Sequence, residues 1–234
     1  LRLRYRVIAT SHGPAYARGK WGSISKRLIR LGDHFYGVFP DLLTCVSSPL
    51  AREYEGRYGR PVHYLPNGVD SDDSADPEAA SATLKAHGVR DDYLLFAAGR
   101  LDSTKGCHLL LDAFNRLRPD HQLVVIGNPA TAPAYSHQLR EMAGSRVVFI
   151  PFIESKATLL GIVKGSRLFV FPSTVEAMSM MLLEAASVGT PILCSDIPEN
   201  TGVLGDTAIY IKSGDGGDLA MKLKWALDHP EDMT

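Results

Sequence analysis

After residue 90, short apolar runs alternate with longer amphipathic stretches through the rest of the sequence. The apolar runs have the length and composition of strands, and they fall at Tyr93–Ala98, Gln122–Ile126, Val147–Phe152, Leu168–Phe171 and Ile192–Cys194. The amphipathic stretches have helical spacing, and they fall at about 106–117, 134–143, 155–164, 178–188 and 216–228. Strands that are apolar throughout and separated by single helices indicate a parallel sheet covered on both faces. We therefore expect an α/β fold with a doubly wound, Rossmann-type domain that binds ligands at the carboxyl ends of its strands.

Residues 1–70 are organised differently. Their strand-like runs fall at Val7–Thr10, Leu42–Val46 and Val62–Leu65, with helices expected near 22–36 and 49–57. Three strands and two helices are too few elements for a sheet that is stable on its own. The acidic stretch Asp70–Pro77 that follows has the composition of a linker. We predict that 1–70 is the last part of a first α/β, Rossmann-like domain whose opening strands are missing, that 71–78 is a linker, and that 79–234 is a second Rossmann-like domain.

Composition excludes several classes of protein. The sequence has 234 residues, 45% of them hydrophobic, and a formal net charge of -1, which is ordinary for a globular protein and argues against bulk nucleic-acid binding. No run of apolar residues is long enough to span a membrane, and the start is not a signal peptide, so we expect a cytoplasmic protein. The widely spaced Cys45, Cys107 and Cys194 favour reduced core thiols over disulfides or a zinc site.

Positive charge is concentrated at the start of the chain. Residues 1–30 contain eight Lys or Arg and no Asp or Glu, with Tyr5, Tyr16 and Trp21 interleaved. Such a block suits an anionic membrane surface, a phosphorylated acceptor or nucleic acid. A solvated basic face is an equally good interpretation, and the alternatives stay open from sequence alone.

Two carboxylates mark the segment Pro172–Ala186. Glu184 lies in a stretch that is otherwise almost entirely apolar, which predicts a buried helix over 178–188 and a carboxylate that needs a partner. Glu176 falls in the turn before this helix, beside its free N–H groups. The pair suits a ligand that carries hydroxyls and a phosphate. The alternative is structural, with Glu184 tied to a backbone amine or an Arg.

The turn Gly99–Gly106 is the second chemical feature. It follows the first strand of the second domain, opens a helix, and places Arg100 and Lys105 between two glycines. A cationic cup at a helix N-terminus favours phosphate, and an Arg with a Lys could neutralise a diphosphate without a metal. The turn is not a Walker loop, because Gly-Lys-Ser/Thr is missing.

The order of motifs along the chain resembles that of retaining glycosyltransferases of family 4, which have the GT-B fold. The motifs are Val46-Ser47, Pro66-Asn67-Gly68-Val69-Asp70, Gly99-Arg100 with Lys105-Gly106, Phe171-Pro172-Ser173, Glu176 with Glu184, and Gly189-Thr190-Pro191. The resemblance runs from about residue 7 to the end. It implies that 1–70 belongs to an acceptor-side domain and that 79–234 is a nucleotide-sugar-binding domain. It further implies transfer of a sugar from a nucleotide diphosphate to a hydroxyl acceptor, with retention and with neither a metal nor a cofactor.

The resemblance also implies roles for individual residues. Arg100 and Lys105 would hold the donor's diphosphate, Glu184 the ribose hydroxyls and Glu176 the transferred sugar. Backbone N–H groups of Met178, Ser179 and Met180 would meet the sugar and the distal phosphate. His12, in the turn after a strand, matches the family's acceptor-side histidine, which faces the reacting carbon. A packed histidine at a strand end is the alternative for His12.

Departures from the family pattern put details in doubt. Ala177-Met178-Ser179 stands where Gly or Ala, an aromatic and Gly are frequent, so donor choice stays open. The run Arg18-Gly19-Lys20-Trp21-Gly22 resembles transferases of bacterial surface polysaccharides, which suggests a lipid-linked acceptor at the inner face of the membrane. We interpret Asp70-Ser71-Asp72 as part of a turn rather than a metal-binding D-x-D motif.

Two other functions stay open from the sequence. One is a GT-B-fold sugar-nucleotide epimerase, which would convert a donor without an acceptor. The other is a non-catalytic nucleotide-sugar-binding domain, whose function would survive loss of Arg100. Because part of the first domain is expected to be missing, we expect these 234 residues alone to bind donor weakly and to transfer little sugar.

Overall fold

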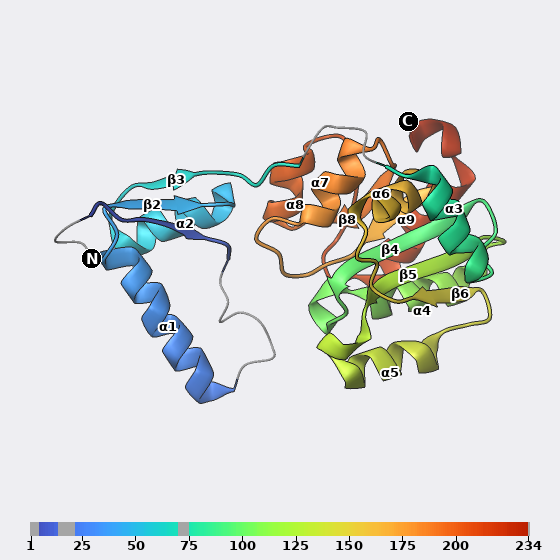
Figure 1. Cartoon of the computed structure of the whole chain (residues 1–234), viewed down its shortest axis with the longest axis horizontal. Helices are drawn as coiled ribbons and strands as arrows, with labels where there is room; N and C mark the ends of the chain where they lie inside the picture. The colour runs from blue at the N-terminus through green and yellow to red at the C-terminus, as the bar shows by residue number, and fades with distance from the viewer. Residues whose placement is uncertain (1–4, 14–21, 70–74, 234) are drawn as a thin grey trace. The chain divides into compact units, whose positions relative to one another are not determined.

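The computed structural model describes residues 5–13, 22–69 and 75–233 (Figure 1). The chain forms two compact units. Unit 1 comprises Leu1–Gly68, Val175–Ser179 and Pro198–Val203, and unit 2 comprises Val69–Thr174, Met180–Ile197 and Leu204–Thr234. Residues 71–74 of the predicted linker 71–78 lie outside the described residues, and helix α3 (Pro77–Ala86) begins inside the predicted linker.

Unit 1 contains a small parallel sheet. Its strands are β1 (Ile8–Ser11), β2 (Leu42–Cys45) and β3 (Val62–Tyr64), in the order β1-β2-β3. Helix α1 (Ser23–Val38) connects β1 to β2, and α2 (Ser48–Tyr58) connects β2 to β3. Helix α2 begins where the Ser47 side chain accepts a hydrogen bond from the Leu50 N–H, and ends at Gly59 in the left-handed conformation.

Unit 2 contains a parallel sheet with the strand order β6-β5-β4-β7-β8-β9. In chain order the strands are β4 (Tyr93–Arg100), β5 (Gln122–Asn128), β6 (Val147–Ile150), β7 (Leu168–Phe171), β8 (Ile192–Ser195) and β9 (Ile209–Ile211). The order reverses direction at the neighbouring strands β4 and β7, which is the switch point where doubly wound sheets bind ligands. The expected Rossmann-type sheet is confirmed.

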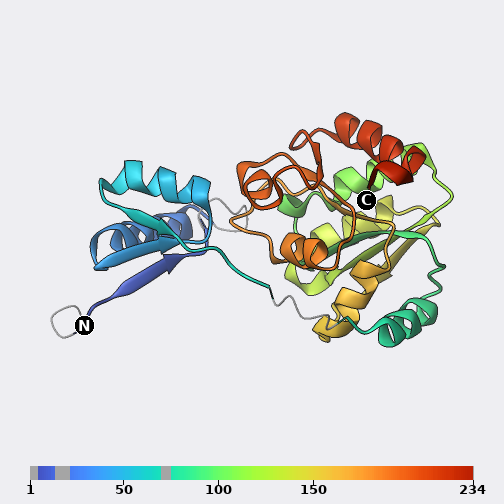
Figure 2. The ribbon, with the colours of Figure 1, turned by 90° about the horizontal axis from the view of Figure 1, so that it is seen from above.

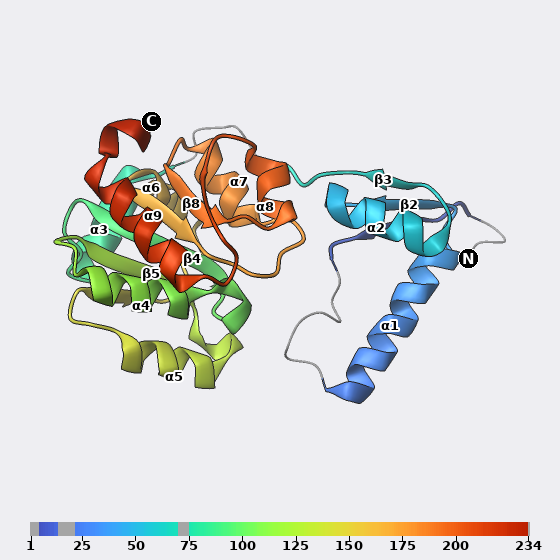
Figure 3. The same ribbon diagram turned by 180° about the vertical axis from the view of Figure 1, so that it is seen from behind.

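Helices cover both faces of this sheet (Figures 2 and 3). Helix α3 packs on α6 (Lys156–Lys164), which contacts α7 (Met180–Ser187). On the other face α4 (Cys107–Leu117) packs between α5 (Pro133–Met142) and α9 (Gly216–Asp228). Burial on both faces explains why the strands are apolar throughout: every residue of β7 is buried.

Several elements differ from the sequence-based expectation. Helix α7 begins at Met180 rather than at 178, and only Leu182 and Ala185 are buried, so the expectation of a helix buried on all sides is wrong. Strand β6 ends at Ile150 because Pro151 has no N–H for the ladder. Helices α3 and α8 (Pro198–Leu204) and strand β9 were not predicted.

The cysteines agree with the expectation. Cys45, Cys107 and Cys194 are free and buried, and burial raises the pKa of each thiol, that of Cys194 to about 12. Each thiol therefore stays protonated at neutral pH. None of the helices in the described part of the chain combines the length and the apolar character needed to cross a bilayer.

Candidate functional site

The turn after β4 is built by three local devices. The pairing of β4 with β5 shifts register between Ala98 and Arg100, which forms an irregularity at Gly99. The Asp102 side chain then caps a short 3-10 turn, η2 (Ser103–Lys105), by accepting from the Thr104 N–H at 3.0 Å. Gly106, with a φ of +71°, leads directly into α4. The sequence therefore encodes a tight reversal of the chain at the carboxyl end of β4.

This turn meets the segment after β7. A Cβ atom on Gly106 would overlap the carbonyl oxygen of Pro172, so only glycine allows the approach. The backbone N–H of Thr174 donates to the carbonyl oxygen of Thr104 at 2.7 Å, and its hydroxyl donates to the same oxygen at 3.3 Å. The turns that follow β4 and β7 are therefore joined at one edge of the sheet.

The positive charges of the turn come from two side chains. Arg100 is half-buried, and its guanidinium has no ion pair or hydrogen bond to any other described residue. The Lys105 Nζ lies 5.5 Å from the centre of the Phe171 ring, which places the ammonium beside the last residue of β7. Helix α4 begins directly after this turn, and its N-cap residue, Gly106, provides no side-chain cap. The arrangement offers two cations and a helix N-terminus to an anionic ligand.

Glu184 is held in unit 2 on α7. Its side chain is 13% exposed, and the nearest cation is the Lys156 Nζ on α6, 3.9 Å from Oε1. Burial raises the pKa of Glu184, and the Lys156 ammonium opposes that shift. No hydrogen bond to the carboxylate is made by another described residue. Within the described residues, neither a backbone N–H nor an Arg, as the structural alternative requires, donates to this carboxylate. Its oxygens can therefore still accept hydrogen bonds.

Four of the predicted site residues lie in unit 1: His12, Glu176, Met178 and Ser179. His12 is exposed in the turn after β1, and a Cβ atom on the adjacent Gly13 would come within 2.7 Å of the Ala177 Cβ. The Asn67 N–H lies 3.1 Å from the Met178 Sδ. Unit 1 therefore brings the His12 turn together with the segment Val175–Ser179, which carries Glu176, Met178 and Ser179. Unit 2 holds Arg100, Lys105, Met180 and Glu184.

Met178 and Ser179 precede α7 instead of belonging to it. The helix was expected to start at 178, but both residues are in the loop and Met180 is the first helical residue. Ser179 is 7% exposed and Met180 is 39% exposed. The backbone N–H groups expected to bind a ligand thus come from a loop and a helix start, not from the first turn of one helix.

Sequence reasoning missed two charged residues near the predicted ones. Lys156, the partner of Glu184, is the first residue of α6, and only its position after the Ser155 cap was visible in the sequence. Glu199 lies in the first turn of α8, in unit 1. Burial raises the pKa of Glu199, and the carboxylates of Glu176 and Glu53 raise it further. The indication of Glu199 in the sequence was an acidic residue that follows the carboxyl end of a strand.

Some predictions fall on residues that the structure does not describe. They are residues 18–21 of the run Arg18–Gly22, the Asp70-Ser71-Asp72 turn, and the part of the basic block that lies in 1–4 and 14–21. Over the described ranges, no group of three or more His, Cys, Asp or Glu side chains is placed to hold a metal ion.

A parallel sheet of this strand order, with a cationic glycine turn at its switch point, defines a doubly wound protein of the Rossmann type. Comparison with protein families gives the particular class. The model of the family "Glycosyl transferases group 1" matches residues 82–234, and that of "Glycosyltransferase Family 4" matches residues 1–73. The chain belongs to the group 1 glycosyl transferases, and the resemblance inferred from the sequence motifs is confirmed.

Individual proteins extend this comparison. The chain is 27% identical to the D-rhamnosyltransferase WbpZ of Pseudomonas aeruginosa over 98% of its own length and 56% of that protein. It superimposes on Anabaena Alr3699/HepE, solved in complex with UDP and glucose, with a TM-score of 0.83 and 18% identity, covering 98% of this chain and 64% of that one. For the sucrose-phosphate synthase of Thermosynechococcus elongatus the TM-score is 0.77 and the identity 21%, covering 99% of this chain and 62% of that one. These likenesses confirm the expected GT-B fold.

Proposed function

We propose that this chain is the donor-binding part, with a portion of the acceptor side, of a glycosyltransferase. The enzyme would move a sugar from a nucleotide-diphosphate sugar to a hydroxyl acceptor, with retention and without a metal. One observation carries the proposal: Gly106 and Pro172 join the turns after β4 and β7, so that Arg100 and Lys105 stand at the switch point of the sheet. The family membership and the UDP and glucose bound by HepE support it.

The proposed chemistry rests on charge that grows in the transition state. As the bond between the sugar and the diphosphate breaks, negative charge develops on the leaving phosphate. Arg100, Lys105 and the α4 N-terminus would stabilise that charge more than the ground state, which is the differential effect that catalysis needs. These groups would take the place of a metal in neutralising the diphosphate.

Other residues would orient the donor and the acceptor. Glu184, whose carboxylate can still accept hydrogen bonds, would bind the ribose hydroxyls, and Glu176 the transferred sugar. Backbone N–H groups of Met178, Ser179 and Met180 would bind the sugar and the distal phosphate. His12, exposed after β1, would face the reacting carbon from the acceptor side.

Calorimetry with nucleotides tests this proposal. The protein is titrated with UDP, GDP, dTDP and ADP, and then with the matching sugar donors. One nucleotide is expected to bind, and Arg100→Ala and Glu184→Gln are expected to weaken it. Arg116→Ala and Glu141→Gln are matched controls, because both residues are exposed and lie near the C-terminal ends of α4 and α5, away from the turn that begins α4. Binding that survives in both site variants would overturn the assignment.

Product analysis of the full-length protein tests the reaction. The anomeric configuration of the product, read by NMR, is expected to match that of the donor, and activity is expected to persist in EDTA. Conversion of the donor without any acceptor would favour an epimerase instead. Binding of the donor without turnover of any kind would favour a non-catalytic nucleotide-sugar-binding domain.

We further propose that the acceptor is lipid-linked and lies at the inner face of an anionic membrane, as in the synthesis of a bacterial polysaccharide or glycoconjugate. The basic block 1–30 supports this, and its described part on α1 exposes Arg27 and Arg30 next to Ile24 and Leu28, which are 78% and 65% exposed. Co-sedimentation with vesicles is expected to increase with the fraction of anionic lipid. Equal binding to neutral vesicles would contradict the proposal.

A further inference from the structure

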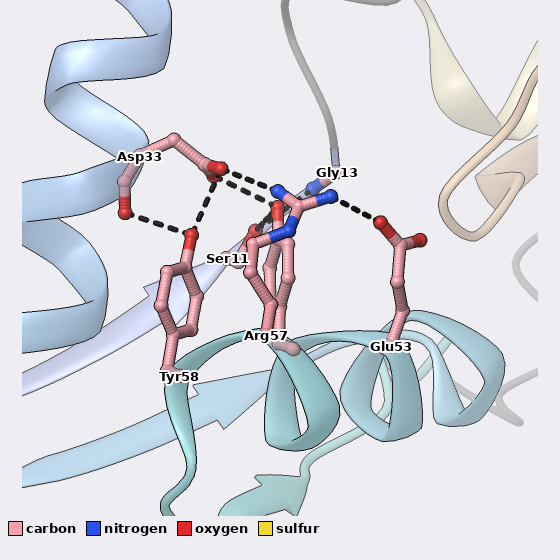
Figure 4. Close-up of polar contacts among 7 residues, drawn as sticks. Ser11, Gly13, Asp33, Glu53, Arg57 and Tyr58 are labelled. Atoms are coloured by element: carbon pink, nitrogen blue, oxygen red, sulfur yellow. Dashed lines mark hydrogen bonds and ion pairs between the residues drawn. The ribbon is translucent and has the colours of Figure 1, made fainter.

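The turn that carries His12 is tied to the helices of unit 1 by a continuous series of hydrogen bonds (Figure 4). The Gly13 N–H donates to the Ser11 Oγ at 3.3 Å, and the Ser11 hydroxyl donates to the Tyr54 hydroxyl at 3.5 Å. The Tyr54 hydroxyl in turn donates to Asp33 Oδ1 at 3.1 Å. The series therefore runs from the backbone beside His12, through α2, to a carboxylate on α1.

Every hydrogen bond in this series points the same way. Each hydroxyl accepts from the side of the turn and donates toward Asp33, so the dipoles add and each bond strengthens the next. The carboxylate at the end is fixed: the Arg57 guanidinium lies 2.7 Å and the Tyr58 hydroxyl 2.8 Å from Oδ2. Arg57 is held in its turn by Glu53. The Asp33 side chain is only 16% exposed, which limits competition from water.

Core packing alone does not explain this arrangement. Tyr54 is fully buried, in the cluster with Leu43, Cys45 and Leu50, and a phenylalanine ring would fill that place equally well. Tyr58 lies one helical turn further along α2 and also donates to Asp33. Only the Tyr54 hydroxyl, however, makes a bond to Ser11 and so reaches the turn after β1. Both tyrosines therefore donate to Asp33, but only Tyr54 of the two is also bonded to Ser11.

We propose that Tyr54 and Asp33 are positioning residues for His12. They would fix the Ser11 hydroxyl, and through it the Gly13 backbone, and thereby hold the His12 imidazole in its orientation. The backbone at Gly13 has a φ of +115°, and because glycine adopts many conformations, neighbouring contacts are needed to hold it in one. The inference rests on the proposed acceptor-side role of His12.

Kinetics of the full-length protein test this inference. In Tyr54→Phe we expect kcat to fall roughly tenfold, because small displacements of a reacting group are costly, while the KM for the donor changes by less than about twofold. Tyr58→Phe removes one hydroxyl from the same carboxylate, but the Arg57 guanidinium still holds that carboxylate, so kcat is expected to stay unchanged. Ser11→Ala should reproduce Tyr54→Phe, and the double variant should be no worse than either, because both break one series. Equal losses in Tyr54→Phe and Tyr58→Phe would overturn the inference.

NMR of the His12 ring provides a readout that does not need activity. The nitrogen chemical shifts of the His12 ring are expected to change in Tyr54→Phe and to stay the same in Tyr58→Phe. Unchanged His12 nitrogen shifts in Tyr54→Phe would also overturn the inference. If His12→Ala retained full kcat, the proposed role of His12 would fail, and the positioning role would then be decided by the NMR comparison alone.

Discussion

Gly106 approaches Pro172 so closely that a Cβ atom on the glycine would overlap the carbonyl oxygen of the proline. The two residues belong to neighbouring segments at the switch point, one at the start of α4 and one just after β7. The contact brings the cationic turn against the segment that leads to Glu176 and Glu184. The absence of a side chain at Gly106 therefore allows the turns after β4 and β7 to meet.

The first prediction distinguishes two costs of replacing Gly106, which are the loss of its close approach to Pro172 and the strain of its left-handed backbone conformation. Gly189 has the same φ as Gly106, +71°, but a Cβ atom there would meet nothing within 4 Å. Gly189→Ala should therefore lose only the left-handed preference, about 1–2 kcal/mol. Gly106→Ala should lose more, since the backbone must also move, and should abolish nucleotide binding. Urea unfolding of both variants measures the difference, and equal losses would show that the approach to Pro172 is unimportant.

The second prediction concerns Glu184 and pH. Burial raises its pKa in the folded state above the unfolded value of about 4.5, so the stability that it contributes is complete below that value and is lost as pH rises through the folded pKa. Without ligand, Glu184→Gln should melt close to the parent protein at pH 4 and above it at pH 7. Glu154→Gln, at an exposed position, is the control. A variant less stable at pH 7 would show that the pairing with Lys156 outweighs burial.

The third prediction concerns His108 on α4. Its Nδ1 lies 2.8 Å from the Tyr135 hydroxyl, and burial lowers the pKa of the imidazole. A lowered pKa means stability that is present above the unfolded value of about 6.5 and lost as pH falls through it. His108→Gln should therefore flatten the decline in stability between pH 7 and pH 5. His137→Gln, at an exposed histidine on α5, should leave the decline unchanged, as thermal melts across that range would show.

The fourth prediction tests the target of Arg100. If its guanidinium binds the distal phosphate, Arg100→Ala should weaken binding of the nucleoside diphosphate about tenfold to a hundredfold, as expected for hydrogen bonds to charged groups. The affinity for the monophosphate of the same base should change much less. Arg116→Ala serves as the control on the exposed side of α4. Parallel losses for both nucleotides would place Arg100 at the base or ribose instead.

Much of the fold followed from the sequence because the strands of unit 2 are buried on both faces. Leu94 and Phe169, for example, are fully buried, and such strands form continuous apolar runs. Helix α3 escaped prediction because it buries a single residue, Ala80, and therefore shows little periodicity. Strand β9 was missed although its Ile-Tyr-Ile run has the β-branched and aromatic residues that are typical of strands.

The candidate site was predictable where its residues are local in the chain. The turn Gly99–Gly106 was found because its glycines and cations lie within one loop. Its junction with Pro172, and the pairing of Glu184 with Lys156, join residues far apart in the sequence, and no local pattern indicates them. The series from Gly13 to Asp33 likewise depends on three separate elements.

The strand order has a consequence for when the candidate site can form. Strands β4 and β7 are neighbours, with Leu94 paired to Leu168, yet β5 and β6 lie between them in the chain. A nascent chain that has emerged only as far as β6 therefore holds the cationic turn but lacks the edge that completes it, and long-range strand pairing is slow. A ligand bound there can stabilise only the late stages of folding. During synthesis the protein must reach β7 without that help.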